Sequence, residues 1–370
     1  MALFGGPKKE SFLGVDIGAG GLKVVELSNE KGRATLLTYG YSERLPGETP
    51  VSPFDDVKGT AETLAQLCAR AGVKTAKAMA ALPLSSIFST IVAVPRRGNE
   101  KEMKPLIDTQ VAKLTPLPIA EMITYSTFID PLQAGKASGT QAAGKEQTSP
   151  AGKPSDYVRV LVTGAAKTFV QKYIDIFRAA KLELQAIDTE SFALVRSLVG
   201  KDKSAILLLD IGYTRTNITV VEKGIPFLTR SINVGGSLVT KKVMEQMNVS
   251  EAEAEQLKTD LGNQPALVSG KLPPAVEAIM GPILHEVQYA LQLYARMELT
   301  EFKKVDKVVL TGGSAHLPGL PEHLSSALNL NVYRGDPWAR VAYPQDLRPV
   351  LDEIGPRMAV AIGLAMREMD

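Results

Sequence analysis

The residues best suited to chemistry lie in two turns, and each turn follows an apolar run that ends in Asp-Ile-Gly. The first turn spans Asp16 to Lys23 and the second spans Asp210 to Thr216. Because small residues in a tight turn let several backbone N–H groups point into one concavity, either turn suits phosphate oxygens. A lone hairpin of this kind is usually only a turn, so a function is indicated by the pair.

Acidic residues stand where both of these strands are expected to be buried. A carboxylate at the end of a buried strand is costly unless a cation or water meets it, and Mg²⁺ held through water is a common solution beside phosphates. Asp16 and Asp210 fit that role. Lys23 can place its ammonium on the same phosphates as a point charge.

Other kinds of site are disfavoured. Cys68 is the only cysteine, so no intramolecular disulfide can form, and its apolar helical context favours a core residue over a nucleophile. His285, His316 and His323 share no metal-ligand spacing, so we expect no zinc site. The 42 Lys and Arg against 40 Asp and Glu leave a net charge of +2 without a long basic run, which disfavours nucleic acid as a partner.

Composition and hydropathy indicate a soluble globular chain. Hydrophobic residues are 45% and charged residues 22% of the 370 residues, enough for two or three domains with their own cores. The N-terminal MALFGGPKKE has no apolar stretch long enough for a signal peptide, and no run of about 18 apolar residues occurs. We therefore expect a cytoplasmic protein with no direct membrane insertion.

The elements around the two turns show a duplication. FLGVDIGAGGLKVVELSNEKG and ILLLDIGYTRTNITVVEKG each read as strand, turn, strand and turn, and each continues into a third strand-like run. Helical patterns lie between and after them, as in KTFVQKYIDIFRAAK, where one face carries Phe169, Tyr173, Ile176 and Phe177. The pattern predicts a duplicated α/β fold.

Residues 133–156 differ from the rest because they are Gly, Ala, Ser, Lys and Gln with hardly any apolar bulk. Such a segment cannot bury enough surface to offset its ordering entropy. We expect a long mobile hairpin loop over residues 133–155, between the strands MITYSTFI and YVRVLVTGA. A docking arm is the functional alternative to a tolerated insertion.

A third element completes the pattern: a strand from Val308 to Thr311 runs into Gly312 and Gly313 and then toward a helix. Two such turns followed by this element resemble the actin, Hsp70 and sugar-kinase superfamily. More closely, the chain resembles the FtsA/PilM family over nearly its whole length. The stretches that carry the resemblance are LFGGPKKESFLGVDIG, LLLDIGYTRTNITVVEKGIPFLTRSINVGG, SEAEAEQLK, KVVLTGGSAHLPGL and GPRMAVAIGLAMRE.

The resemblance implies ATP and Mg²⁺ as cofactors and assigns their residues. The first phosphate loop would comprise Asp16, Gly18, Ala19, Gly20, Gly21 and Lys23, and the second Asp210, Gly212, Tyr213, Thr214, Arg215 and Thr216. The adenosine end would be Gly312, Gly313 and Ser314, with the nucleoside lined by Gly235, Gly236, Glu255 and Lys258. The metal would be held by Asp16 and Asp210 through water. Relatives often carry Ser or Thr hydroxyls where this chain has Ala19, Gly20 and Gly21, so backbone donors would have to compensate.

Any hydrolysis of ATP would depend on one candidate residue, Glu190. In IDTESFALVRSL, Glu190 best matches the glutamate that bacterial actins place near the attacking water, which implies at most a slow ATPase. The alternative is that these residues only begin a helix, because Thr189 followed by Glu190 and apolar periodicity also fits an N-cap and an acidic first turn.

The architecture implied by the resemblance is a two-lobed actin-like fold with duplicated ribonuclease H-like domains and an FtsA-type 1C insertion. Subdomain 1A would comprise residues 1–84, 187–203 and 344–370. The 1C insertion would be residues 85–186, read as strand, helix, strand, loop, strand, helix and strand. The second lobe would be residues 204–343, with a helical 2B part at about 237–305.

The function implied by the resemblance is a cytoplasmic platform, or a ring of copies, in a type IV pilus machine. It would bind the short N-terminal tail of the membrane protein PilN near subdomains 1A and 1C, and reach the inner membrane through protein partners. One alternative is an FtsA-type membrane tether, which needs an amphipathic C-terminal helix. Another is a sugar or acid kinase, which needs a carboxylate base aimed at a substrate hydroxyl.

Overall fold

Contacts divide the chain into two units, a larger one of residues 1–86 and 168–370 and a smaller one of residues 87–167. The structure is a computed structural model that describes residues 10–30, 32–44, 47, 52–130, 156–262 and 272–369. The loop predicted over residues 133–155 lies outside them. Each unit is described by itself.

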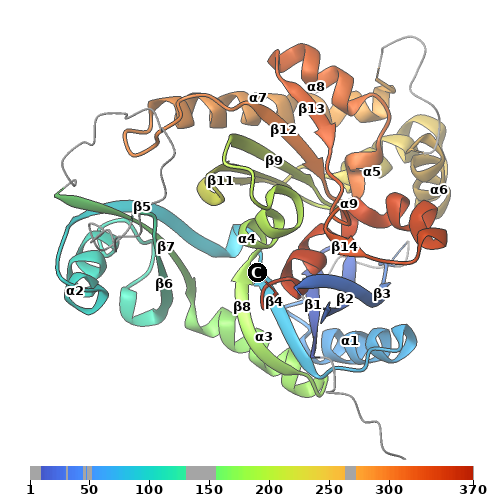
Figure 1. The fold of residues 1–370 in the computed structure, drawn as a ribbon. Helices are drawn as coiled ribbons and strands as arrows, with labels where there is room; N and C mark the ends of the chain where they lie inside the picture. The colour runs from blue at the N-terminus through green and yellow to red at the C-terminus, as the bar shows by residue number, and fades with distance from the viewer. Residues whose placement is uncertain are drawn as a thin grey trace, which may run out of the picture. The chain divides into compact units, whose positions relative to one another are not determined.

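The first sheet of the larger unit has six strands in the order β14-β3-β2-β1-β4-β8 (Figure 1). The pairs β1/β2 and β2/β3 are antiparallel, whereas β1/β4, β4/β8 and β3/β14 are parallel. The strands are β1 (Ser11–Gly18), β2 (Gly21–Glu30), β3 (Arg33–Tyr41), β4 (Lys77–Leu82), β8 (Glu183–Thr189) and β14 (Val341–Ala342).

The second sheet repeats the first. Its order is β11-β10-β9-β12-β13, with two antiparallel pairs followed by two parallel pairs. Its strands are β9 (Ala205–Ile211), β10 (Thr216–Glu222), β11 (Ile225–Ile232), β12 (Lys307–Thr311) and β13 (Asn331–Arg334). Counted in chain order from β1 in the first sheet and from β9 in the second, the first five strands of each sheet lie in the order third, second, first, fourth and fifth. The predicted duplication is therefore confirmed.

Continuous apolar runs place β1 and β9 at the centre of their sheets. Residues 12–17 of β1 are buried, and so is every residue of AILLLDI in β9 except Asp210. Strands that are covered by packing on both faces read in this way, whereas a strand with one wet face alternates.

Helices cover the sheets of the larger unit and the α4 and α9 helices join their cores (Figure 1). A Cβ on Gly14 of β1 would lie 1.9 Å from the carbonyl oxygen of Ala361, and one on Gly363 would lie 1.8 Å from that of Ala193, so both positions need glycine for close approach. The helices are α1 (Val57–Ala71), α3 (Lys167–Ala179), α4 (Glu190–Leu194), α5 (Gly236–Met247), α6 (Glu251–Gly262), α7 (Pro274–Arg296), α8 (Leu320–Leu328) and α9 (Arg348–Ala365).

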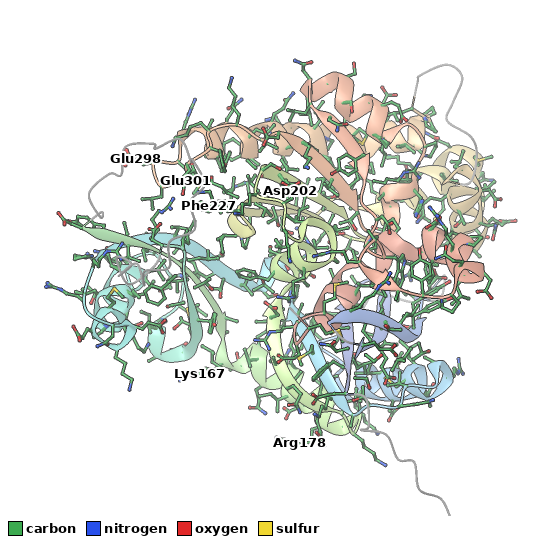
Figure 2. All side chains as sticks on the ribbon, in the orientation of Figure 1. Lys167, Arg178, Asp202, Phe227, Glu298 and Glu301 are labelled. Atoms are coloured by element: carbon green, nitrogen blue, oxygen red, sulfur yellow. The ribbon has the colours of Figure 1, made fainter. Side chains whose placement is uncertain are left out.

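Surface ion pairs tie loops to these elements. Asp202, labelled in Figure 2, accepts from Lys307 Nζ at 2.6 Å and so joins the turn before β9 to the start of β12. This contact, with backbone and hydroxyl donors from Ser204, lowers the pKa of Asp202 to about 2.

The smaller unit is an antiparallel sheet in the order β5-β7-β6 with α2 packed on one face. Its elements are β5 (Ile87–Pro95), α2 (Glu100–Val111), β6 (Met122–Phe128) and β7 (Tyr157–Ala166). The strands and helices expected over residues 85–186 are all present. Two of these elements, α3 and β8, nevertheless make contacts within the larger unit. Strand β8 pairs with β4, and the Tyr173 hydroxyl of α3 donates to the carbonyl of Ala81 at 2.8 Å. The subdomain bounds stay a prediction.

The described part of the chain contains no helix that is both long and apolar enough to cross a membrane.

Candidate functional site

The first predicted turn is a tight hairpin between β1 and β2. Gly18 pairs with Gly21, which leaves Ala19 and Gly20 as the two turn residues. Gly21 has a φ of 130°, and a Cβ there would lie 2.0 Å from the carbonyl oxygen of Ser42. The turn therefore needs glycine at this position, and it exposes backbone rather than side chains.

Asp16 and Lys23 are cross-strand partners in this hairpin. Asp16 is 9% exposed, and its Oδ2 lies 3.2 Å from Lys23 Nζ. The ammonium also lies over the turn, because a Cβ on Gly18 would be 2.9 Å from Nζ. The predicted metal carboxylate and the predicted phosphate cation thus occupy the same end of the hairpin.

The second predicted turn joins β9 to β10. The Gly212 N–H donates to the carbonyl of Arg215 at 2.9 Å, which closes the turn around Tyr213 and Thr214. Thr216 is fully buried, and its hydroxyl donates to a backbone carbonyl at 2.7 Å. This hydroxyl is therefore a structural group in the present arrangement.

The glycines at the start of α5 pack directly on the second turn. The Gly236 N–H donates to the carbonyl of Gly212 at 2.9 Å, and a Cβ on Gly235 would lie 2.7 Å from the carbonyl oxygen of Tyr213. A Cβ on Gly236 would lie 2.4 Å from Ser314 Oγ. The predicted nucleoside glycines and the predicted adenosine end therefore meet.

Ser314 follows the two glycines after β12. Its hydroxyl donates to the carbonyl of Gly212 at 3.4 Å, and the Gly312 N–H donates to the carbonyl of Pro356 in α9 at 3.0 Å. Gly313 begins a short 3₁₀ turn, Gly313–His316. The strand-Gly-Gly element is thus fixed between the second turn and the last helix.

Glu255 and Lys258 lie on α6 and bind one another and α5. Their carboxylate and ammonium are 2.5 Å apart, and both contact Thr240, with distances of 2.6 Å to Glu255 and 2.9 Å from Lys258. A Cβ on Gly236 would be 3.7 Å from Lys258 Nζ. Lys258 therefore lies beside the predicted nucleoside glycines, and Glu255 is paired with it.

The two turns themselves are in contact. A Cβ on Gly20 would lie 2.8 Å from the Cβ of Tyr213. The sites named from residues 16–23, 210–216, 235–236, 255–258 and 312–314 therefore belong to one region of the larger unit.

Glu190 is the first residue of α4, and it faces the same region. Its Oε2 accepts from the Leu84 N–H at 3.0 Å and from Asn217 Nδ2 at 3.1 Å. Thr189 caps the helix, because its hydroxyl accepts from the Phe192 N–H at 3.3 Å. The helix-start interpretation therefore accounts for Thr189, while the Glu190 carboxylate bonds groups outside its own helix.

Repulsion among the carboxylates marks the electrostatics of the site. Removal from water raises the pKa of Glu190 to about 8, with further contributions from Asp210 and Asp16. Removal from water, followed by the charge of Asp16, raises the pKa of Asp210 to about 6. Lys23 opposes both shifts. The site therefore has more negative charge than one ammonium can neutralise.

This charge excess fits a divalent cation bound with an anionic ligand. Within the described residues, no three His, Cys, Asp or Glu side chains lie close enough to hold a metal ion. An ion near Asp16 and Asp210 would therefore take its other ligands from water and phosphate, the donors that Mg²⁺ keeps in phosphate sites. The backbone turns and Lys23 suit that phosphate.

Asn217, Arg44 and Glu251 were missed by sequence reasoning. Asn217 pairs with Asp210 across β9 and β10, hydrogen-bonds its carboxylate, and accepts from Ser231 Oγ at 2.8 Å. A four-residue turn between these strands implies that cross-strand pairing, so the signal for Asn217 was present. Arg44 donates to the Tyr213 hydroxyl and to Glu251 from a distant segment, and no local pattern indicates these contacts.

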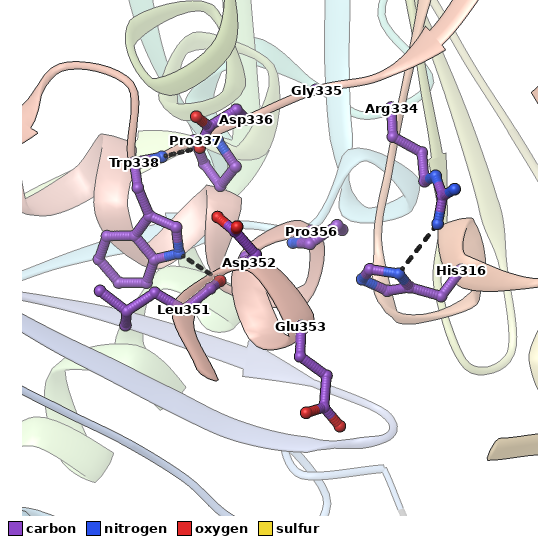
Figure 3. Close-up of a pocket in the computed structure, with 11 residues that line it drawn as sticks. His316, Arg334, Gly335, Asp336, Pro337, Trp338, Leu351, Asp352, Glu353 and Pro356 are labelled. Atoms are coloured by element: carbon purple, nitrogen blue, oxygen red, sulfur yellow. Dashed lines mark hydrogen bonds between the residues drawn. The ribbon is translucent and has the colours of Figure 1, made fainter. Parts of the chain in front are cut away.

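A separate pocket of about 530 Å³ opens between β13 and α9 (Figure 3). Its described lining includes His316, Arg334, Trp338 and Glu353, and none of the residues predicted to bind nucleotide. Arg334 contacts His316 Nδ1 at 3.2 Å, and Trp338 Nε1 donates to the carbonyl of Leu351 at 2.9 Å.

Comparisons with known proteins point to one family. A family model described as type IV pilus assembly protein PilM matches residues 146–369. The cell division protein FtsA of Enterococcus faecalis is 22% identical over 360 residues, which cover 88% of this chain and 78% of the relative. FtsA of Bacillus subtilis is 26% identical over 200 residues, which cover 48% of this chain and 44% of the relative, so the match spans less than half of its length.

Solved structures establish the fold. The PilM-PilN type IV pilus biogenesis complex contains a chain similar to this one with a TM-score of 0.77 and 24% identity, covering 98% of this chain and 100% of that chain. MreB5 of Spiroplasma citri bound to AMPPNP is similar with a TM-score of 0.53 and 13% identity, covering 96% and 95%. The fold is therefore the two-lobed actin-like α/β fold, as the duplicated sheets already indicated.

Proposed function

Because the chain belongs to the type IV pilus assembly protein PilM family, we propose that it is a nucleotide-loaded scaffold of a pilus machine. The scaffold binds ATP with Mg²⁺ in the larger unit and a partner peptide on the smaller unit. Any hydrolysis adjusts the arrangement of the scaffold and processes no other substrate.

One observation carries the nucleotide proposal: segments far apart in the chain converge. The glycine after β12 and the glycines that open α5 pack on the second Asp-Ile-Gly turn, and the second turn packs on the first. Backbone groups gathered in this way suit an anion, and the excess of carboxylates suits a divalent cation beside it.

The residues divide the tasks by their chemistry. Lys23 and the backbone of both turns bind phosphates, Asp16 and Asp210 hold Mg²⁺ through water, and Ser314 with the α5 glycines receives the nucleoside. When bound, ATP supplies a transferable phosphoryl group and Mg²⁺ neutralises its charge. Glu190 orients or deprotonates water in our proposal.

The protonation state of Glu190 would make any hydrolysis depend on the bound metal ion. With a pKa of about 8 in this arrangement, its carboxyl group holds its proton at neutral pH and is a poor base. A divalent cation near Asp16 and Asp210 would lower that pKa. Hydrolysis would then depend on the metal being in place.

Calorimetry with ATP and Mg²⁺ tests the nucleotide proposal. We expect wild-type protein to bind and Asp210→Ala to lose most of its affinity, because it removes a metal carboxylate. Asp346→Ala, at an exposed position on a short turn, is the matched control and should bind as wild type does. Wild-type protein that binds no adenine nucleotide with Mg²⁺ present would refute the proposal.

The partner proposal is an extended peptide, the N-terminal tail of PilN. A solved PilM-PilN complex contains a chain with this fold, and none of the predicted nucleotide residues lies in the smaller unit. The outer strands of its sheet, β5 and β6, leave backbone groups for an added strand. Ile123 and Tyr125 of β6 are 50% and 71% exposed, Tyr157 at the start of the central strand β7 is 55% exposed, and all three offer apolar contacts.

A fluorescent PilN N-terminal peptide tests this docking. We expect binding to wild type and to a variant that lacks residues 133–155, and no binding to a variant in which residues 87–167 are replaced by a short linker. Nucleotide binding by that last variant shows that the larger unit has folded. Undiminished peptide binding by such a folded variant would contradict docking on the smaller unit.

In our proposal, the partner PilN determines where the protein acts and where its copies assemble. The protein acts in the cytoplasm, reaches the inner membrane through PilN, and forms a ring of copies in the machine. The similarity to the cell division protein FtsA leaves the alternative that the resemblance implies, a membrane tether that binds lipid directly. Pelleting with liposomes in the absence of PilN separates the two, because only a tether sediments.

A further inference from the structure

One arginine connects three segments around the predicted nucleotide site. Arg44 follows β3, and its NH2 and Nε atoms donate to the Tyr213 hydroxyl at 2.7 and 3.2 Å. The same guanidinium forms an ion pair with Glu251, the first residue of α6. Its central carbon lies 5.4 Å from the centroid of the Tyr213 ring. We call Arg44, Tyr213 and Glu251 the clasp.

The ion pair in the clasp is partly shielded from water, and both carboxylate oxygens of Glu251 make contacts. The second oxygen of Glu251 accepts from the Gly47 N–H at 2.7 Å, so Glu251 binds two points of the segment after β3. The side chains of Arg44 and Glu251 are 14% and 24% exposed. Donation from Gly47 and Arg44 lowers the pKa of Glu251. Such a pair is stronger than the exposed pairs that contribute little to stability.

The segment that carries Arg44 is also attached to the first turn. The Ser42 N–H donates to the carbonyl of Leu22 at 2.8 Å, and the Leu22 N–H donates back to Ser42 Oγ at 3.0 Å. The Arg44 N–H donates to the carbonyl of Gly20 at 3.4 Å. The clasp therefore joins the first turn and its sheet to the second turn and α6, which are the two sides of the predicted site.

We propose that the Arg44–Tyr213–Glu251 clasp holds these two sides together and sets the rate at which nucleotide enters and leaves. The inference rests on the proposed nucleotide function and adds a regulation to it. Tyr213 belongs to the predicted second phosphate loop, whereas Arg44 and Glu251 lie outside the predicted binding residues, so substitutions at these two weaken the clasp without removing a predicted binding residue.

The clasp should change rates more than affinity. It joins protein to protein in the arrangement described here, so it stabilises the closed arrangement with or without nucleotide. Nucleotide passes only when the sides separate. A variant without the ion pair therefore opens more often, and both the association and the dissociation rate rise while their ratio stays nearly constant.

Stopped-flow fluorescence with a fluorescent ATP analogue and Mg²⁺ tests the proposal. In Arg44→Ala and in Glu251→Gln we expect dissociation about tenfold faster than in wild type, and a Kd within about threefold, because a lost hydrogen bond to a charged group corresponds to about a factor of ten or more. Glu298→Gln, at an exposed position labelled in Figure 2, is the matched control and should exchange as wild type does.

The double variant tests whether Arg44 and Glu251 act through their contact with one another. If Arg44 and Glu251 act on one another, Arg44→Ala combined with Glu251→Gln should be no faster than the faster single variant, whereas independent effects would multiply. Reversing the pair, with Arg44→Glu and Glu251→Arg together, should restore part of the slow exchange.

Two failures are distinguishable. A wild-type protein that binds no nucleotide removes the proposed function and this proposal with it. A wild-type protein that binds, with both single variants dissociating within twofold of its rate, overturns the clasp alone. Faster dissociation must be accompanied by a structural change. Without nucleotide, the amide hydrogens of α6 should exchange more slowly in wild type than in Arg44→Ala.

Discussion

A Cβ atom on Gly312 would lie 2.3 Å from Oδ1 of Asp210, so the backbone after β12 touches the carboxylate at the end of β9. The two strands are adjacent and parallel, with Thr311 in register with Asp210. Two motifs whose residues Asp210 and Gly312 are 102 positions apart therefore meet at the carboxyl ends of neighbouring strands, where α/β sheets bind ligands.

Gly312→Ala should damage the site more than Gly313→Ala. Gly312 has a φ of 87°, which strains any residue with a side chain, and its Cβ would also lie 2.5 Å from the carbonyl oxygen of Ile211. We expect a loss of at least about 1–3 kcal/mol in unfolding free energy and of ATP affinity. No described heavy atom lies within 4 Å of a Cβ on Gly313, so that variant should keep the unfolding free energy of wild type. Denaturant unfolding and calorimetry measure both; equal damage from the two variants would contradict the contact.

The pH dependence of stability should reveal the carboxyl group of Glu190. Its pKa rises from an ordinary 4.5 to about 8 on folding, so between these values the folded protein holds a proton that the unfolded chain releases. The stability that this proton contributes is present below about pH 4.5 and is lost as the pH rises toward 8. Glu190→Gln should remove this slope and, at about pH 8, be more stable than wild type by about 4 kcal/mol.

Denaturant unfolding of the nucleotide-free protein across this pH range gives the measurement. Glu121→Gln, on the exposed 3₁₀ turn Ile119–Glu121, is the control and should keep the wild-type slope. Parallel pH profiles for wild type and Glu190→Gln would show that Glu190 is ionised at neutral pH in the folded protein.

Asn217 should act on hydrolysis through Glu190. Its amide donates to the Glu190 carboxylate at 3.1 Å and is itself held by Ser231. Glu190→Gln and Asn217→Ala should each lower ATP turnover by at least about tenfold while ATP binding is kept, since positioned bases contribute factors of this size or more. In the Glu190→Gln background, Asn217→Ala should have no further effect on turnover. Multiplying effects on turnover would separate the two roles, and lost binding in Glu190→Gln would sink its assignment.

The sequence predicts those parts of the site that local patterns determine. Two Asp-Ile-Gly hairpins require their glycines and carboxylates in a given order, and the register that pairs Asp16 with Lys23 follows from a two-residue turn. The Arg44 contact with Tyr213 depends on how segments 169 positions apart pack, and no periodicity encodes it. The same limit applies to β8, whose place beside β4 is set by the whole sheet.

Lys23→Ala should separate the phosphate role of this lysine from its ion pair with Asp16. The ammonium lies 3.2 Å from that carboxylate, and its charge lowers the pKa of both Glu190 and Asp210. Without it, the repulsion among the carboxylates grows and the phosphates lose a point charge, so we expect the Kd for ATP to rise by about tenfold or more at fixed Mg²⁺. Raising the Mg²⁺ concentration should recover part of the affinity, because the added cation offsets the missing charge.

Calorimetric titration at two Mg²⁺ concentrations measures both effects. Lys58→Ala, on the exposed face of α1 where the side chain is 89% exposed, is the matched control and should bind ATP as wild type does. An unchanged Kd in Lys23→Ala, with the unfolding free energy lowered, would mean that Lys23 serves only its ion pair with Asp16 and does not reach the phosphates.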